Sequence, residues 1–376
     1  MRNASPKYLV TGATGNLGGA LLQALVENTP AHVVALVRPQ SRGALKRLLA
    51  GLPAAADRVS IVEGDVRAPL FGLQHDDAAI EGLTDIVHAA ANVDWRASGD
   101  DLIATNLAGA ENCAELANLL IARGSLERCS YISTAYAGGI RTGTIAEEPL
   151  RFSDTFSNRY EMSKFLAERI FLDRVRCPVN VIRPTAIVGD SRTGTIRNFS
   201  TLYYPFKLVH QAQLSLLPAR PDATLDIVPL DFVVDVVMAM HASAANDHRI
   251  VHAAAGSHAV TIRRLWELCA GAFNKLDGGS RPLQGIFVPP GPFLFAAAGA
   301  GVLPAGIRRK LRKLALFIPY ITTQRCYATA GAEKLGLTAP AFETYVETLC
   351  RFAVDMAFGA RTLGDRARLG SFGSAR

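Results

Sequence analysis

A glycine-rich turn near the N-terminus constrains the fold of this chain more than any other feature. The run Thr11-Gly-Ala-Thr-Gly-Asn-Leu-Gly18 follows a short apolar segment and opens a stretch with helical spacing. Gly12 permits a tight turn, Gly15 lets the backbone approach a pyrophosphate, and Gly18 lets the helix pack close to the strand. A turn without a ligand is the alternative, but this context favours phosphate at a helix N-terminus. The turn therefore predicts a dinucleotide site contacted by Thr11, Gly12, Thr14, Gly15, Asn16, Leu17 and Gly18.

The first 190 residues alternate short β-branched runs with longer helical patterns, which is typical of a parallel sheet with crossover helices. This order predicts an α/β fold with a doubly wound, Rossmann-type parallel sheet. We expect strands at Tyr8–Val10, His32–Val37, Val59–Glu63, Asp85–His88, Cys129–Ser133 and Val179–Arg183. Helices are expected near Leu17–Glu27, Ser41–Ala50, Leu102–Ala122 and Asn158–Val175. In the last of these, one buried face is predicted from the spacing of Met162, Phe165, Leu166, Ile170 and Phe171.

The pattern changes after about Gly189, where prolines separate shorter elements. We interpret residues 1–190 as a dinucleotide-binding domain that also holds the catalytic residues. Residues 191–362 are predicted to form a smaller, mostly helical substrate domain with segments that return to the sheet, including a helix over Phe232–Ala242. Residues 363–376 are rich in Arg, Gly and Ser and are predicted to form a flexible tail.

One long segment, Pro282–Ile307, has no charged residue and is followed by the basic run Arg308-Arg-Lys-Leu-Arg-Lys313. Its prolines interrupt it well short of the roughly 20 apolar residues that span a membrane. The first interpretation is a buried or pocket-lining helix. The second is an apolar hairpin, over residues 282–313, that contacts a membrane surface peripherally with its basic run facing anionic lipid. A core segment followed by a solvated charge run is the third.

Charge and cysteine content narrow the environment. The six cysteines form no CxxC pair and have no His at ligand spacing, so we expect reduced thiols, no disulfide and no metal site. No signal-peptide apolar region is present at the start, and a cytoplasmic protein is predicted. The net charge of +7 favours an anionic ligand, although a solvated basic surface explains it equally well. The basic residues are scattered without interleaved aromatics, so nucleic acid is not an expected partner.

The end of the second predicted strand indicates which dinucleotide binds. An NAD enzyme usually places Asp or Glu there for the ribose 2′-hydroxyl. This chain instead has Arg38, with Ser41 and Arg42 close behind, which suits a 2′-phosphate and predicts NADPH. After the third and fourth strands, further cofactor contacts are expected from Asp65, Val66, Ala89, Ala90 and Ala91.

A phenol and an ammonium, Tyr160 and Lys164, lie four residues apart on one face of a predicted helix. A tyrosine with its usual pKa of about 10 is a poor acid–base group at neutral pH, and we expect the nearby cation to lower that pKa. Upstream, a strand ends in Ser133 and Thr134. Thr134, or less favourably Ser133, is predicted to donate a hydrogen bond to a substrate carbonyl, the alternative being a turn or helix cap.

Several motifs together resemble the extended short-chain dehydrogenase/reductase family. They are the glycine turn, Leu36-Val-Arg38, His88–Trp95, Ser133–Tyr136, Tyr160-Glu-Met-Ser-Lys164, Arg183-Pro-Thr185, Gly189–Gly194 and Asp226–Val234. Within that family the pattern is similar to the branch of fatty acyl-CoA reductases and thioester reductase domains. The resemblance covers roughly residues 7–240, whereas residues 245–340 match no motif.

The resemblance implies an NADPH-dependent reductase that converts an acyl thioester, bound to coenzyme A or to an acyl carrier protein, to an aldehyde and in some members onward to the alcohol. Thr134, Tyr160 and Lys164 would be the catalytic triad, with Asn106 a fourth member through water. Pro184 and Thr185 would contact the cofactor. No carrier or adenylation domain is attached, so a stand-alone reductase is expected, and dimers are common in the family.

Two other function classes stay open. A ketone or sterol dehydrogenase needs the same three catalytic residues, and a nucleotide-sugar enzyme of this fold would prefer NAD, against which Arg38 argues. A non-catalytic NADPH sensor ranks last because the tyrosine is retained.

Overall fold

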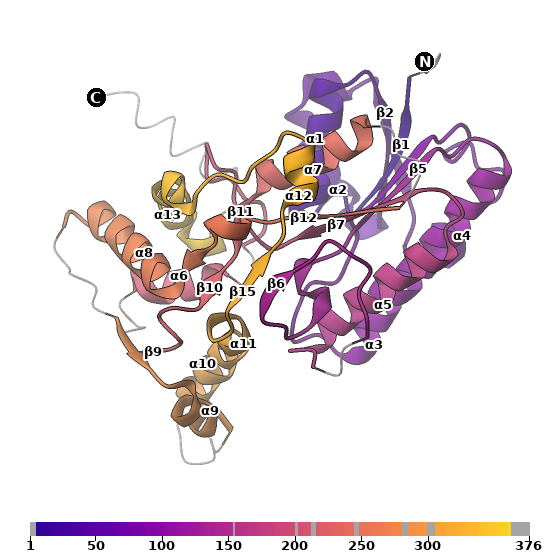
Figure 1. Cartoon of the computed structure of the whole chain (residues 1–376). Helices are drawn as coiled ribbons and strands as arrows, with labels where there is room; N and C mark the ends of the chain where they lie inside the picture. Colours follow the sequence, from indigo (N-terminus) through magenta and orange to yellow (C-terminus); the bar gives the residue numbers. More distant parts are fainter. Residues whose placement is uncertain are drawn as a thin grey trace, which may run out of the picture.

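The computed structural model describes residues 5–152, 155–199, 202–211, 216–243, 248–279, 285–298 and 305–361. The predicted tail, 363–376, lies outside these ranges. A seven-stranded parallel sheet crosses the molecule in the order β12-β7-β5-β4-β1-β2-β3 (Figure 1). Its strands are β1 (Lys7–Thr11), β2 (His32–Val37), β3 (Val59–Glu63), β4 (Asp85–His88), β5 (Arg128–Ile132), β7 (Val179–Pro184) and β12 (Arg249–Ala253).

The doubly wound sheet is confirmed, and all six predicted strands are present. The seventh, β12, was not predicted. The strand order reverses beside β1, since the chain runs from β1 to β2 and β3 on one side and then to β4 on the other. Thr11 is in register with both Leu36 of β2 and His88 of β4. The carboxyl ends of these strands therefore meet at a switch point, where such sheets bind ligands.

Helices cover both faces of the sheet. On one face α1 (Asn16–Asn28), α2 (Arg42–Ala50) and α7 (Leu230–Ala242) share a core with the strands, and on the other α4 (Ala108–Ala122) and α5 (Arg159–Arg174) do so. The helix predicted over Leu102–Ala122 is α3 (Gly99–Leu102), a π-helical turn (Ile103–Leu107) and then α4. The predicted face of α5 is partly wrong, because Met162 is exposed while Phe165 and Phe171 are buried.

The second half packs beside the carboxyl edge of the sheet around its own apolar core (Figure 1). Its helices are α6 (Tyr203–His210), α8 (Ile262–Leu276), α9 (Pro290–Ala298), α10 (Ala305–Ala315), α11 (Ile318–Ile321), α12 (Ala330–Lys334) and α13 (Val346–Asp355). Short strands pair two by two: β6 (Gly143–Ile145) with β15 (Arg325–Tyr327), β8 (Ala186–Val188) with β11 (Ile227–Pro229), β9 (Leu216–Pro218) with β14 (Ile286–Val288), and β10 (Thr224–Leu225) with β13 (Val260–Thr261). The domain division at residue 190 stays a prediction.

The described part of the uncharged segment 282–307 does not match the first interpretation, a buried or pocket-lining helix. It includes β14 and α9, while residues 282–284 and 299–304 lie outside the described ranges. Leu294 of α9 and Ile286 of β14 are exposed, so this part of the segment is not core either. Among the described residues, no helix is long and apolar enough to cross a membrane.

Candidate active site

The glycine turn links β1 to α1 at the switch point. Gly12 has a φ of +73°, and a Cβ on it would lie 2.8 Å from the carbonyl carbon of Ala89, at the end of β4. A Cβ on Gly18 would collide with the carbonyl oxygen of Gly12. Only glycine fits at either position, because the obstacle is backbone in both cases. The turn is therefore closed tightly enough to bring the start of α1 against the strand ends.

The start of α1 offers an anion site. Gly15 occupies its N-cap position, and Gly15, Asn16, Leu17 and Gly18 line the main cavity. Amides in the first turn of a helix have no partner within the helix and carry partial positive charge. This donor set fits the pyrophosphate of a dinucleotide.

A loop from the second half closes over the same turn. Asn16 and Asn198 exchange two hydrogen bonds of 2.8 Å, each between the side chain of Asn16 and the backbone of Asn198. The half-buried Arg197 donates from Nη1 to the carbonyl oxygen of Gly15 at 3.4 Å. Sequence reasoning did not find Arg197 or Asn198, because contacts across about 180 residues leave no local pattern.

The residues predicted to bind the adenosine part of the cofactor are more exposed to solvent. Arg38 is exposed at the end of β2, and Arg42 forms an ion pair of 2.8 Å with Glu63, in which both side chains are 43% exposed. The carboxylate of Asp65 accepts hydrogen bonds from Arg67, which lower its pKa, and the charge of Arg38 lowers that pKa further. Arg38 and Asp65 therefore lie close enough for their charges to interact, as expected for two residues at one end of the sheet.

Four further residues predicted to contact the cofactor have different surroundings. The hydroxyl of buried Thr11 bonds Nδ1 of His88 and accepts from the amide of Ala90, both at 3.1 Å. Val66 is buried, and its carbonyl accepts from Asn112 at 2.8 Å. Ala89 and Ala91 line the cavity. By contrast, Thr11, Thr14, Arg38, Arg42, Asp65, Val66 and Ala90 are not among the residues that line it.

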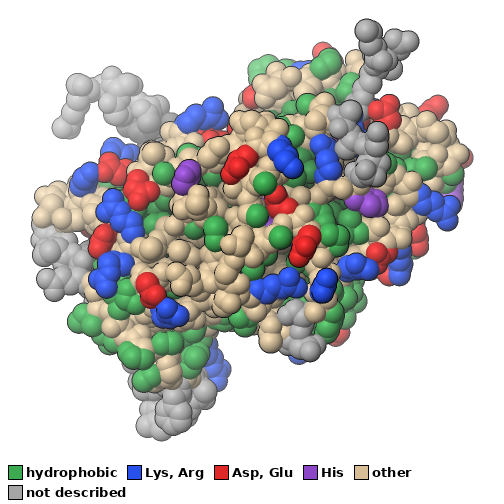
Figure 2. Space-filling view, viewed as in Figure 1, with side chains coloured by type: hydrophobic (Ala, Val, Ile, Leu, Met, Phe, Trp, Pro, Cys, Tyr) green, Lys and Arg blue, Asp and Glu red, His purple; other side chains and the backbone are tan. Residues whose placement is uncertain are grey.

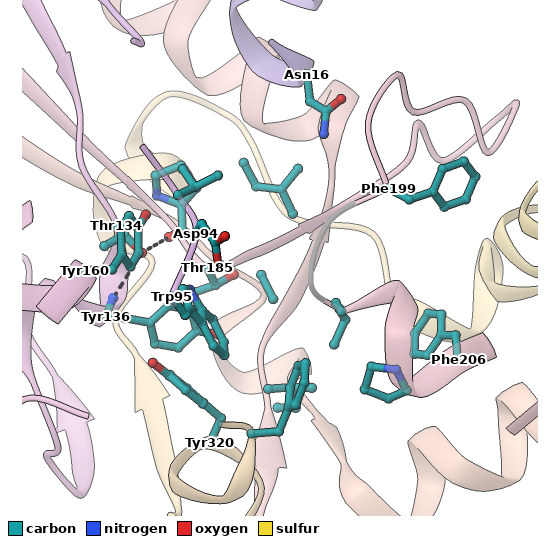
Figure 3. A pocket seen from close by; sticks show the side chains of 18 of the residues that line it. Asn16, Asp94, Trp95, Thr134, Tyr136, Tyr160, Thr185, Phe199, Phe206 and Tyr320 are labelled. Carbon is teal, nitrogen blue, oxygen red and sulfur yellow. Dashed lines mark hydrogen bonds between the residues drawn. The ribbon is translucent and has the colours of Figure 1, made fainter. Parts of the chain in front are cut away.

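The predicted catalytic triad meets at the cavity wall. Thr134 follows β5, and Tyr160 and Lys164 lie one turn apart in α5; all three are buried and line the cavity. Asn158 caps α5 by accepting from the amide of Glu161 at 3.0 Å, which sets where the helix begins. Figure 3 shows Thr134, Tyr136 and Tyr160 together on one side of the cavity, with Phe199 and Phe206 across it.

The pKa values of Tyr160 and Lys164 differ from the prediction. Nζ of Lys164 donates to the carbonyl oxygen of Ile132 at 2.6 Å and lies 4.3 Å from the centre of the Tyr131 ring. Burial lowers the pKa of Lys164 to about 7, although Glu168 acts in the opposite direction. Burial raises the pKa of Tyr160 above its usual value, and a hydrogen bond with Thr134 opposes this only partly. The expected lowering of the Tyr160 pKa by Lys164 is therefore wrong for the protein alone, because desolvation raises that pKa and the effect that opposes it comes from Thr134.

Two residues proposed beside the triad have structural partners. Ser133 donates to Oε2 of Glu168 at 2.7 Å, and Glu168 forms a fully buried ion pair of 2.5 Å with Arg183. The side chain of Asn106 bonds Ser163 at 2.9 Å and the backbone of Asn92 at 2.7 and 3.0 Å. Ser133 touches the cavity wall, whereas Asn106 is not among the lining residues. Ser133 and Asn106 both form hydrogen bonds with side chains of α5 and so help to fix the position of that helix.

The cavity has a volume of about 580 Å³ and extends from the glycine turn past Tyr160 into the second half. Pro184 and Thr185, which were predicted to contact the cofactor, line it, and the Thr185 hydroxyl donates to the carboxylate of Asp226 at 2.7 Å. Sequence reasoning missed an aromatic wall formed by Trp95, Tyr136 and Tyr320. Trp95 stacks on Tyr320 at 4.7 Å, and Tyr136 meets Tyr320 edge-on at 5.0 Å (Figure 3). Trp95 and Tyr136 belong to the family-like motifs His88–Trp95 and Ser133–Tyr136, whereas Tyr320 lies in no motif that the sequence reveals.

Comparison with known proteins identifies relatives. Residues 10–237 match the family model described as male sterility protein. A hybrid PKS-NRPS synthetase, pydA of Acremonium sp, is 36% identical over 199 residues, which are 50% of this chain and 4% of the synthetase. The glycine betaine reductase ATRR of Emericella nidulans is 27% identical over 65% of this chain and 20% of its own length. A Drosophila melanogaster protein named as a putative fatty acyl-CoA reductase is 25% identical over 63% and 52%. The chain thus spans about half of the fly protein and a small part of the other two.

Solved structures share the fold. The terminal R domain from the myxalamid PKS-NRPS pathway superposes with a TM-score of 0.78 at 23% identity, covering 95% of this chain and 92% of that one. A UDP-glucuronic acid 4-epimerase from Bacillus cereus, in complex with NAD, has a TM-score of 0.65 at 16% identity, with 94% and 99% covered. At these identities the similarity establishes the architecture and not the substrate.

Proposed function

Because the chain belongs to the male sterility protein family, within the extended short-chain dehydrogenases/reductases, we propose that it is an NADPH-dependent reductase of acyl thioesters. The observation that carries the proposal is the position of Thr134, Tyr160 and Lys164. They are buried side by side on the wall of one cavity that begins at the glycine turn. A carbonyl placed against these three groups has a hydroxyl and a phenol within reach of its oxygen.

The residues have separate tasks. NADPH, when bound, supplies the hydride that adds to the carbonyl carbon. Thr134 donates a hydrogen bond to the oxygen, which gains negative charge as the hydride arrives. Tyr160, which is protonated at neutral pH, gives that oxygen its proton. The carbon–sulfur bond of the resulting hemithioacetal then breaks, and the thiol leaves with a proton as the aldehyde forms. Lys164 would hold the nicotinamide ribose and Asn106 would relay protons through water.

Several features support NADPH as the cofactor. Arg38 is exposed at the end of β2, where a 2′-phosphate would lie, and no acidic residue stands at that position to repel it. The amides at the start of α1 suit the pyrophosphate. Ala89, Ala91, Pro184 and Thr185 would contact the rest of the dinucleotide, since they line the cavity between the turn and Tyr160.

We place the entry of the thioester at the loop of residues 93–96, which lines the cavity and includes the strongly exposed Val93. The thiol carrier, coenzyme A or an acyl carrier protein, would remain outside this opening. Related proteins are named as synthetases that combine PKS and NRPS units, and one related structure is titled a thiolation-reductase di-domain, which supports a carrier-bound substrate.

Assays with purified protein test the function. We expect NADPH oxidation with acyl-CoA or acyl carrier thioesters, together with release of thiol and aldehyde. One NADPH consumed per thiol indicates that the reaction stops at the aldehyde, and two indicate the alcohol. Turnover of a free ketone or a UDP-sugar, without any reaction of thioesters, would instead identify a ketone dehydrogenase or a nucleotide-sugar enzyme with this fold.

We also propose a cytoplasmic protein that contacts membranes peripherally. Leu216 of β9 and Ile286 of β14 are paired in register, and both are more than half exposed. Figure 2 shows apolar side chains gathered at the end of the molecule where Figure 1 places β9, α9 and α10. Arg309 and Arg312 of α10 are exposed next to α9 and suit anionic headgroups. A homodimer stays a prediction.

A further inference from the structure

The part of the cavity beyond the aromatic wall is built by three helical segments with matching apolar faces. On α8 the lining residues are Ile262, Leu265, Trp266 and Cys269, at positions i, i+3, i+4 and i+7. This spacing places them on one face of the helix. The other face carries Arg263 and Arg264, which are exposed.

The second segment repeats the pattern. Leu202, Pro205, Phe206 and Val209, at the start of α6 and along it, line the cavity with the same i, i+3, i+4, i+7 spacing. The helices α6 and α8 contact each other. A third wall comes from the turn between α10 and α11, where Leu314, Phe317 and Ile321 line the cavity. We call the space enclosed by these eleven residues the acyl arm.

Charge is distributed unevenly along the cavity. Among the described residues that line the cavity, the charged ones are Asp94, Arg96 and Lys164, which belong to the opening and to the catalytic wall. None of the eleven residues of the acyl arm is charged. A charged or unpaired polar group would lose its hydration in the arm without compensation. Each buried methylene, by contrast, favours binding.

Trp266 separates the acyl arm from the outside. It lines the main cavity and also a second cavity of about 490 Å³, formed by α8 and by residues 285–287. A Cβ on Gly285 would lie 2.5 Å from the Trp266 ring, so the indole is packed directly against that backbone. The ring is therefore a wall that the two cavities share.

We propose that the acyl part of the substrate is an uncharged hydrocarbon chain and that Trp266 limits its length. The proposal rests on the function proposed above and specifies the substrate class for that site. A chain extends from the thioester at Tyr160 into the acyl arm until it meets the indole. A charged or strongly polar acyl group is disfavoured because the eleven described residues of the arm include no charged side chain.

The length of the chain can be varied systematically. With NADPH and straight-chain acyl-CoAs from butyryl to palmitoyl, we expect kcat/KM to rise about three- to fourfold per methylene and to fall beyond a limiting length. Trp266→Ala joins the two cavities and should move the limit to longer chains. Cys269→Phe fills the arm and should move it to shorter ones, which keeps the test decisive if one variant does not fold. Arg264→Ala, on the exposed face of α8, is the matched control and should leave the profile unchanged.

Binding to the inactive Tyr160→Phe variant separates the two proposals. Affinity for acyl-CoA that rises with chain length and is extended by Trp266→Ala supports the acyl arm, even if no thioester is reduced and the proposed function fails. A flat length profile, preference for a charged acyl group, or an unchanged limit in Trp266→Ala would overturn the acyl arm while leaving thioester reduction intact.

Discussion

The phenol of Tyr160 is protonated at neutral pH, and burial raises its pKa further above the usual value; this is the form that can give a proton to a substrate oxygen. Tyr160→Phe removes only this hydroxyl. We expect kcat to fall about 10²- to 10⁴-fold because general acid catalysis is lost. The affinity for NADPH, measured by fluorescence titration, should change little. A variant that retains its rate would show that another group donates the proton.

Arg38 sets the cofactor preference in the proposed site. Arg38→Ala should raise KM for NADPH about 10- to 100-fold, since a charge-assisted hydrogen bond to the 2′-phosphate is lost. KM for NADH should stay nearly constant. Arg42→Ala is the comparison, with a smaller expected effect because Glu63 already neutralises Arg42. Equal effects of Arg38→Ala on both cofactors would contradict a 2′-phosphate contact.

Lys164 links pH to stability in the cofactor-free protein. Its pKa is about 7 in the folded protein, against the usual lysine value of 10.5 that applies to the unfolded chain. The unfolded chain therefore binds more protons between these values, and the free energy of unfolding should rise with pH from about 7 towards 10.5. The difference between the wild type and Lys164→Met, measured by urea denaturation across this range, isolates the contribution. A difference that does not vary with pH would place the lysine in a solvated site.

Residues whose role follows from local spacing were predictable. Gly12 and Gly18 lie in one turn and Tyr160 and Lys164 in one helix, so their relative positions follow from the sequence, whereas the catalytic roles of Tyr160 and Lys164 stay predictions. The hydrogen-bond partners of Ser133 and Asn106 were not predictable. Glu168 lies 35 residues from Ser133, and Ser163 lies 57 residues from Asn106. Likewise the aromatic and apolar residues of the cavity wall are indistinguishable from core residues until the fold places them.

At the level of elements, a buried ion pair joins α5 to the sheet. Glu168 of α5 and Arg183 of β7 are both fully buried, and Ser133 adds a hydrogen bond to the same carboxylate. Glu168→Gln should cost about 3–5 kcal/mol in the free energy of unfolding, because the guanidinium loses its counter-charge inside the protein. Asp173→Asn breaks the exposed pair with Arg169 on the same helix and should cost less than about 1 kcal/mol. Equal costs in chemical denaturation would argue against the buried pair.

The strands β2, β3 and β4 were predicted with the bounds that the structure shows. The missed strand, β12, is Arg-Ile-Val-His-Ala and is as apolar as β4, Asp-Ile-Val-His, but it lies after residue 190, where the regular alternation of strands and helices ends. Its strand conformation comes from parallel pairing with β7. The error at α9 has a different origin, because its apolar residue Leu294 is exposed and does not belong to the core.

At the scale of the molecule, the apolar surface of β9, β14 and α9 lies at the end away from the sheet (Figure 1). We expect the protein to sediment with vesicles that contain anionic lipid and to be released by high salt. Leu294→Glu, on α9, should reduce the bound fraction without changing activity on a short soluble thioester. Equal binding to neutral and anionic vesicles would argue against a role for Arg309 and Arg312.

The central claim is that a hydride reaches a thioester carbonyl held against Thr134, Tyr160 and Lys164. Its most direct test uses NADPH deuterated at C4 of the nicotinamide, on the transferred face, with decanoyl-CoA, followed by mass spectrometry of the product. We predict one deuterium at C1 of decanal, or two at C1 of decanol if reduction continues, with release of one free coenzyme A. Oxidation of the cofactor without deuterium at C1, or recovery of intact decanoyl-CoA, would contradict thioester reduction by this site.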